Sequence, residues 1–125
     1  MSKVHRVLFD KEWREKLLNG TKTATIRKAS SRMTRRVSAG DIIVAIHTIH
    51  TPVDKGFARF LVLVAEEMTW APKRNKSGYP WPVIKDQHLA RTGANRQWYI
   101  DRYGEAILDE PMKYIQFVRL EGGEG

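Results

Sequence analysis

The segment that decides the fold is residues 20–27, Gly-Thr-Lys-Thr-Ala-Thr-Ile-Arg, where a predicted helix gives way to a predicted strand. Upstream, apolar residues recur at helical spacing after Asp10, which is a favourable N-cap residue. We therefore expect a helix over residues 10–18. Asn19-Gly20 ends this helix, because glycine adopts the left-handed conformation of a helix terminus at little cost.

Downstream, the side chains of residues 23–27 alternate as they do in a half-buried strand. Ala24 and Ile26 are expected to face the core. The opposite face then carries Thr23, Thr25 and Arg27, with Lys22 beside the helix end. A row of ammonium, hydroxyl and guanidinium groups suits an anionic or polar ligand, because it presents charge-assisted donors together. The spacing alone is equally compatible with an ordinary solvated face of a sheet.

A wider pattern surrounds this segment. A helix, the motif Gly-x-Lys-x-x-Thr-x-Arg, a basic loop, and then Gly40-Asp41 before an apolar strand follow one another along the chain. This pattern resembles the ASCH domain family, whose fold is PUA-like, specifically over residues 4–49 and more loosely afterwards. The resemblance implies a small β-barrel with a cleft to which the motif strand contributes ligand contacts. It also implies binding of RNA or nucleosides, and some small bacterial members resemble amidohydrolases of acetylated cytidine that use the motif Lys and Thr with a later Glu.

The remaining elements follow from hydrophobic periodicity and turn residues. Strands are expected over residues 4–9, 42–49, 57–67 and 112–120, with a weak helical turn at 84–92 and a better helix at 95–103. Residues 68–82 show no regular pattern. With the resemblance, this order predicts an α+β fold: a PUA-like mixed, partly closed β-barrel of about five or six strands with two or three flanking helices. Strand count alone would also permit an OB-like barrel.

Composition limits the classes of function. The 125 residues predict a single domain over 1–125, with a flexible tail at 121–125, and no apolar run approaches the length of a membrane span. The chain contains no cysteine, which excludes disulfides and thiolate chemistry. His47 and His50 are three apart near a predicted strand and make a poor chelate. We therefore expect no metal, no cofactor, no membrane partner and a cytoplasmic location.

The net charge of +8 is unevenly distributed. Residues 1–40 contain eleven Lys or Arg and three Asp or Glu, whereas residues 41–125 contain eleven of each. A basic field concentrated around the motif favours a polyanionic partner, since phosphates are held by cations independently of sequence. The polar stretch after the motif adds four cations without an acid and is expected to be a mobile loop beside the ligand.

These observations predict an RNA- or nucleic-acid-binding domain with a basic cleft. Between residues 68 and 82, aromatic side chains alternate with cations, a pattern that can stack unpaired bases, although core packing is favoured for at least one of Trp70 and Trp81. The predicted nucleic-acid-binding residues are Lys22, Thr23, Thr25, Arg27, Lys28, Arg32, Arg35, Arg36, Trp70, Lys73 and Arg74.

The alternative is a small hydrolase acting on a modified nucleoside or, as a ribonuclease, on RNA. Lys22 would be the general base or an amide-polarising group, Thr25 an orienting or nucleophilic hydroxyl, and Glu67 the carboxylate. In a ribonuclease the carboxylate would be Glu66 or Glu67. The chain departs from the amidohydrolase pattern here, because no Glu lies between Glu67 and Glu105, and only Asp86 could substitute. No heptad or exposed apolar stripe favours a role in protein interaction alone.

Overall fold

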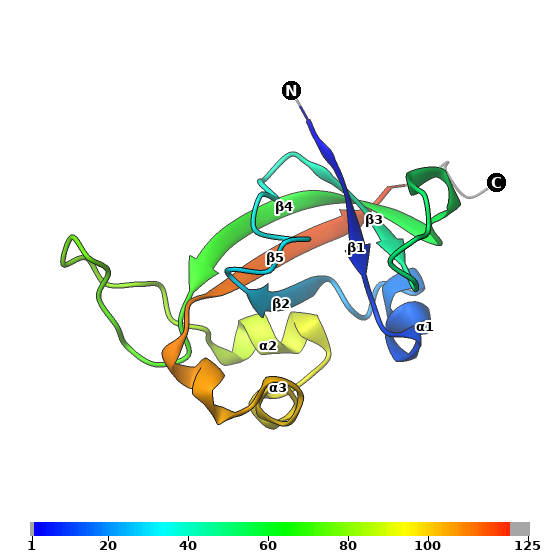
Figure 1. The fold of residues 1–125 in the computed structure, drawn as a ribbon. Helices are drawn as coiled ribbons and strands as arrows, with labels where there is room; N and C mark the ends of the chain where they lie inside the picture. The colour runs from blue at the N-terminus through cyan, green and yellow to red at the C-terminus, as the bar shows by residue number, and fades with distance from the viewer. Residues whose placement is uncertain (1, 121–125) are drawn as a thin grey trace.

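Five strands form one mixed sheet that curls into a half-barrel (Figure 1). The computed structural model describes residues 2–120, so the predicted tail at 121–125 lies outside the described residues. The strands are β1 (Val4–Leu8), β2 (Ala24–Lys28), β3 (Ile42–Ile46), β4 (Ala58–Met68) and β5 (Met112–Arg119), arranged in the order β1-β3-β4-β5-β2. Only β1 and β3 pair in parallel; the other three pairs are antiparallel. The expected α+β, PUA-like architecture is confirmed.

Short helices lie around the sheet. They are α1 (Arg14–Leu18), α2 (Asp86–Thr92) and α3 (Arg96–Tyr103), with 3-10 turns at Lys11–Trp13, Val53–Lys55 and Glu105–Asp109. The helix predicted over residues 10–18 is thus a 3-10 turn continued by α1, and Gly20 follows it with a φ of 83°, as expected. Asp10 occupies the N-cap position with an extended backbone, as predicted, but its side chain makes no capping hydrogen bond.

The sheet separates two hydrophobic cores, because side chains along β5 alternate between its faces. Ile115 and Phe117 pack with the region of β1 and α1, whereas Met112 and Tyr114 pack beneath α2 and α3. On β2, Ala24 and Ile26 belong to the second core, as the alternation predicts. The opposite face of β2 therefore points toward β1 and α1, which is where the candidate site forms.

The basic segment, residues 28–36, is not the mobile loop that its composition suggested. Successive turns are closed by backbone bonds, including Thr34 N–H to the Ser31 carbonyl at 3.2 Å and Val37 N–H to the Thr34 carbonyl at 3.1 Å. Lys113 Nζ donates to the Arg35 carbonyl at 3.0 Å and ties the segment to β5. The segment is therefore a fixed element that presents its arginines on the surface.

Asp41 is a turn residue, as predicted, and also joins the N-terminus to the turn. Its carboxylate accepts hydrogen bonds from the backbone N–H groups of Lys3 and Ser38 and contacts His5 Nε2 at 2.9 Å. The hydrogen bond with His5 is the main reason that the pKa of Asp41 falls to about 2. The ionised carboxylate thus holds β1 beside β3.

The predicted strand ends differ by one to three residues. The largest difference is at β3, which ends at Ile46 rather than residue 49. There His47 Nδ1 contacts the Phe9 carbonyl at 3.1 Å, and Thr51 N–H bonds the Thr48 carbonyl to form a turn. Apolar β-branched residues predicted a longer strand, but the chain reverses before they can pair.

Within residues 2–120, no helix is long and apolar enough to span a membrane. The same part of the chain contains no group of three His, Cys, Asp or Glu side chains arranged to hold a metal ion.

Candidate nucleotide-binding cleft

Lys22 lies deep in a cleft rather than at the exposed end of the strand. Its side chain is only 3% exposed, and Nζ donates to the Thr92 carbonyl at 2.7 Å while lying 4.5 Å from the centre of the Trp13 ring. Burial, followed by the nearby charges of Arg27 and Lys16, lowers the pKa of Lys22 to about 7. Near neutral pH this amine is therefore divided between its charged and neutral forms.

Thr25 and Arg27 form the floor of the same cleft. Arg27 Nε donates to Thr25 Oγ1 at 3.0 Å, and Arg27 Nη2 donates to the Leu8 carbonyl at 2.7 Å. The guanidinium also lies 5.0 Å from the centre of the Phe9 ring. Arg27 thus joins β2 to the end of β1. Because the Thr25 oxygen accepts the hydrogen bond from Arg27, the threonine O–H group can still donate a hydrogen bond to another group.

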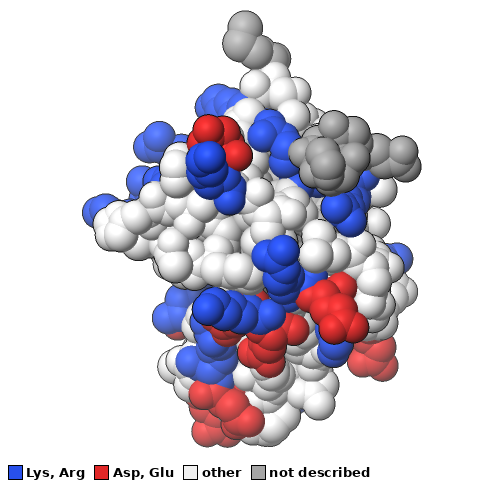
Figure 2. Space-filling model, turned by 90° about the vertical axis from the view of Figure 1, so that its right-hand side faces the viewer, with Lys and Arg blue, Asp and Glu red and all other residues white. Residues whose placement is uncertain are grey.

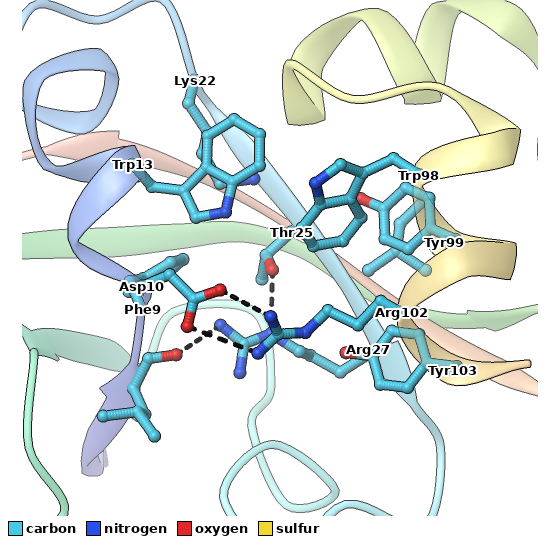
Figure 3. A pocket seen from close by; sticks show the side chains of 12 residues that line it. Phe9, Asp10, Trp13, Lys22, Thr25, Arg27, Trp98, Tyr99, Arg102 and Tyr103 are labelled. Atoms are coloured by element: carbon cyan, nitrogen blue, oxygen red, sulfur yellow. Dashed lines mark hydrogen bonds and ion pairs between the residues drawn. The ribbon is translucent and has the colours of Figure 1, made fainter.

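Three aromatic side chains of α3 line the walls of the cleft: Trp98, Tyr99 and Tyr103. Trp98 packs edge-on against Trp13 at 5.6 Å between ring centres, and Tyr99 and Tyr103 follow along α3 (Figure 3). Burial raises the pKa of Tyr99 to about 12, so it stays a neutral phenol. The cleft therefore combines fixed cations, a hydroxyl and flat apolar surfaces.

An ion pair closes the solvent side of this cleft. Asp10 accepts two bonds from Arg102, at 2.6 Å from Nη1 and 3.3 Å from Nη2, and both side chains are partly exposed (Figure 3). We call this pair the clasp. With the clasp closed, the cleft encloses about 80 Å³. That volume is well below the roughly 300 Å³ at which small-molecule pockets begin, and both residues of the clasp line it.

The clasp was missed in the sequence. The sequence indicated a helix cap at Asp10 and assigned no functional role to Arg102. The two residues are 92 positions apart, and only the docking of α3 beside the 3-10 turn brings them together. Neither the spacing nor the local composition carries a signal for such a contact.

Of the other predicted contacts near the motif, Thr23 and the basic segment lie outside the cleft. Thr23 is half-buried, and its N–H bonds the Arg91 carbonyl at 2.8 Å. Lys28 approaches Glu110 at 3.9 Å. The segment's three arginines are exposed and add charge without lining the cavity: Arg32, Arg35 and Arg36.

The predicted nucleic-acid-binding residues after β4 differ in their exposure: one is in the core and two are on the surface. Trp70 is 8% exposed and packs against Tyr99 at 5.4 Å between ring centres, so its ring belongs to the core and cannot stack on a base. Lys73 and Arg74 are exposed, and they donate to the carbonyls of Asp109 and Gly78. They lie on a projecting segment rather than at the cleft.

Glu67 does not line the cleft. It is exposed, and in the sheet it stands opposite Lys113, which itself stands opposite Arg27. Two strand spacings, about 10 Å, therefore separate the backbones of Glu67 and Arg27. The carboxylate that does lie in the cleft is Asp10, so the predicted catalytic role of Glu67 has no support from its position.

The surface around α1 and the ends of β3 and β4 does not form a continuous basic stripe. Figure 2 shows Lys and Arg interspersed with Asp and Glu on this face, most densely in its lower half. The positive character of the candidate site therefore comes from buried Lys22 and Arg27 more than from this outer face.

No protein-family model matches the sequence, and no curated protein has a significantly similar sequence. Solved structures do match. An ASCH protein from Zymomonas mobilis superposes with a TM-score of 0.61 at 12% identity, covering 93% of this chain and 67% of that one. An ASCH domain from Lactobacillus crispatus JV V101 gives 0.62 at 11% identity, covering 94% and 79%.

A third match is a protein from Enterococcus faecalis V583 assigned to the family DUF984. Its TM-score is 0.61 at 13% identity, with 96% of this chain and 80% of that chain covered. At such identities a structural match is informative about backbone architecture rather than about ligands. Together these likenesses show that the chain has the fold of the ASCH domains.

Proposed function

We propose that this chain binds RNA or another nucleic acid by taking one nucleotide unit into the cleft. The observation that carries the proposal is that buried Lys22, half-buried Arg27 and the Thr25 hydroxyl line one cleft between aromatic walls, with Arg27 bonded to the hydroxyl oxygen. Cations and donors suit a phosphate or the polar edge of a base, and flat rings suit its faces. The concentration of positive charge in residues 1–40 supports the same class of ligand.

Binding of fluorescent single- and double-stranded RNA and DNA across a salt series tests this proposal. Lys22→Met keeps an unbranched apolar side chain and removes the ammonium, which lies 4.5 Å from the centre of the Trp13 ring. We expect about a tenfold or greater loss of affinity, because a hydrogen bond to a charged group contributes roughly 1.5–3 kcal/mol. Lys55→Ala removes an exposed cation from the turn before β4 and is the matched control.

Circular dichroism and thermal melting of each variant separate lost binding from lost structure. If folded Lys22→Met bound every probe as tightly as the wild type did, the cleft would not be the binding site. A loss of equal size in Lys55→Ala would point to a diffuse electrostatic effect instead.

A second candidate function is hydrolysis of an acylated nucleoside, for which two features of the cleft are relevant. The pKa of Lys22 near 7 suits a general base, and Arg27 holds the oxygen of Thr25, the candidate nucleophile. In such a reaction the amide C–N bond breaks, and water finally supplies the oxygen of the released acid and the proton of the amine. Release of acetate from acetylcytidine, lost in both Lys22→Met and Thr25→Val, tests it.

Ribonuclease activity is tested in the same binding samples. Intact RNA after incubation with the wild type would exclude it under those conditions. Cleavage that disappears in Lys22→Met would instead place the chemistry in the cleft.

A further inference from the structure

A second surface of the chain, far along the sequence from the cleft, has the features of a contact for a nucleic-acid strand. Residues 71–82, which we call the arm, leave the end of β4 and project from the body of the molecule (Figure 1). The arm contains Lys73, Arg74 and Lys76 and no acidic residue. No acid within the arm itself balances these three cations, and Lys73 Nζ donates to the backbone carbonyl of Asp109 at 2.7 Å.

The arm is ordered by its own backbone. Trp81 N–H donates to the Lys73 carbonyl, and Asn75 N–H donates to the Tyr79 carbonyl, both at 2.8 Å. At the tip, Asn75 Oδ1 accepts the N–H groups of Ser77 and Tyr79 at 2.9 and 3.1 Å. Gly78 supplies the left-handed conformation of the turn, with a φ of 86°. A hairpin closed in this way presents its side chains with little remaining backbone entropy to lose on binding.

Aromatic surface is exposed on this hairpin. Tyr79 is 70% exposed, the largest value among the exposed large hydrophobic residues in the described part of the chain. Trp81 is half-buried and, with Pro72 and Pro80, lines an open groove of about 330 Å³ that Lys73 and Arg74 flank. Flat rings between cations can stack unpaired bases and neutralise the adjoining phosphates, and such stacking tolerates any sequence.

The position of the arm relates it to the cleft. Met68 of β4 and Lys28 of β2 both stand opposite Met112 of β5, so the arm begins at the end of the sheet where β2 ends. The basic segment starts at that same end, one residue beyond Arg27 of the cleft. The arm and the basic segment thus both begin at the end of the sheet where Arg27 of the cleft lies.

We propose that the arm binds single-stranded nucleic acid, with bases stacked on Tyr79 and Trp81 and phosphates held by its three cations. The ligand of this protein is then a strand that extends beyond the cleft, not a free nucleotide. This last statement rests on the function proposed for the cleft, whereas binding by the arm does not. An acidic peptide would satisfy the cations but would leave the exposed rings without a matching surface.

The experiment measures fluorescence anisotropy with a mononucleotide and with single-stranded RNA and DNA of about 4 to 16 nucleotides, the range of known single-strand sites. We expect affinity to rise with length. Tyr79→Ala should lower affinity for the longer strands by about 5- to 150-fold, the equivalent of one stacked base. Tyr79→Phe keeps the ring and should bind as the wild type does.

The salt dependence isolates the cations of the arm. In Arg74→Ala the slope of log affinity against log salt should fall by about 0.7, which corresponds to one phosphate contact on a single strand. Lys55→Ala is the control, since Lys55 lies in the turn before β4 and the arm follows its other end, about 36 Å along an 11-residue strand. This control should keep the slope.

The outcomes separate the two proposals. Unchanged binding of every strand by Tyr79→Ala, or equal affinity for mononucleotide and long strands, would overturn the inference about the arm while leaving the cleft untouched. Loss in the Tyr79 and Arg74 variants, with normal binding by Lys22→Met, would support the arm and reject the cleft. Binding of an acidic peptide but of no nucleic acid would overturn both.

Discussion

The cleft and the arm use the same kinds of side chain in opposite environments. In the cleft, Lys22 and Arg27 are packed beneath rings and bonded to carbonyl oxygens. In the arm, Lys73 and Arg74 are exposed beside an aromatic residue that is open to solvent. Burial fixes position and shifts protonation, whereas exposure leaves the charge screened by salt. The cleft is therefore suited to selecting a chemical group, and the arm to adding affinity.

The largest expected effect is on stability at Arg27. Arg27→Met should lower the free energy of unfolding by about 2–4 kcal/mol, because the buried Leu8 carbonyl and Thr25 hydroxyl lose their charged partner. Urea unfolding measures the change, and Arg74→Met, in the exposed arm, should stay within about 0.5 kcal/mol. If Arg27→Met and Arg74→Met lowered the free energy of unfolding equally, the cleft cation would contribute no more to stability than the exposed cation of the arm, contrary to this prediction.

The pH dependence of binding should reveal Lys22. Below a pKa of about 7 its amine is charged, and above that value it is increasingly neutral. Affinity for an anionic nucleotide should therefore fall as pH rises through 7, approaching tenfold per pH unit at most. Lys22→Met should bind weakly without this dependence, and Arg74→Ala should retain it. A hydrolase would give the opposite sign, with the rate rising through pH 7 as the base loses its proton.

A smaller effect is expected at the clasp. Asp10→Asn removes the carboxylate that holds Arg102 and frees the guanidinium for a phosphate. Affinity for an anionic nucleotide should rise by roughly fivefold, since a partly exposed ion pair contributes up to about 1 kcal/mol. Asp54→Asn, an exposed acid before β4, is the matched control for net charge. Weaker binding by Asp10→Asn would instead make Asp10 a contact of the ligand.

The smallest effect is on the stability of the arm. Tyr79→Ala should change the free energy of unfolding by no more than about 0.5 kcal/mol, because a ring that is 70% exposed contributes little packing. Thermal denaturation checks this value. A large loss of stability would mean that the Tyr79 ring packs against the rest of the protein and is not free to stack on a base.

Local rules were sufficient for the elements around the motif. The left-handed Gly20 and the inward-facing Ala24 and Ile26 follow from glycine's freedom and from the two-residue period of a strand. Local rules were insufficient for Asp10, whose partner is 92 residues away, and for Glu67, which strand β5 separates from Arg27. Helix docking brings Asp10 to Arg102, strand pairing sets the distance from Glu67 to Arg27, and local composition encodes neither relation.

The sequence by itself determined the α+β class, the motif strand and the excess of positive charge in the first third of the chain. Periodicity and residue type are local properties, so they can be interpreted before any folding is known. Only the tertiary structure decided that Lys22 is buried, that Trp70 is core, and that the clasp closes the cleft. Burial and long-range contacts depend on which elements pack together, and protonation and accessibility follow from that packing.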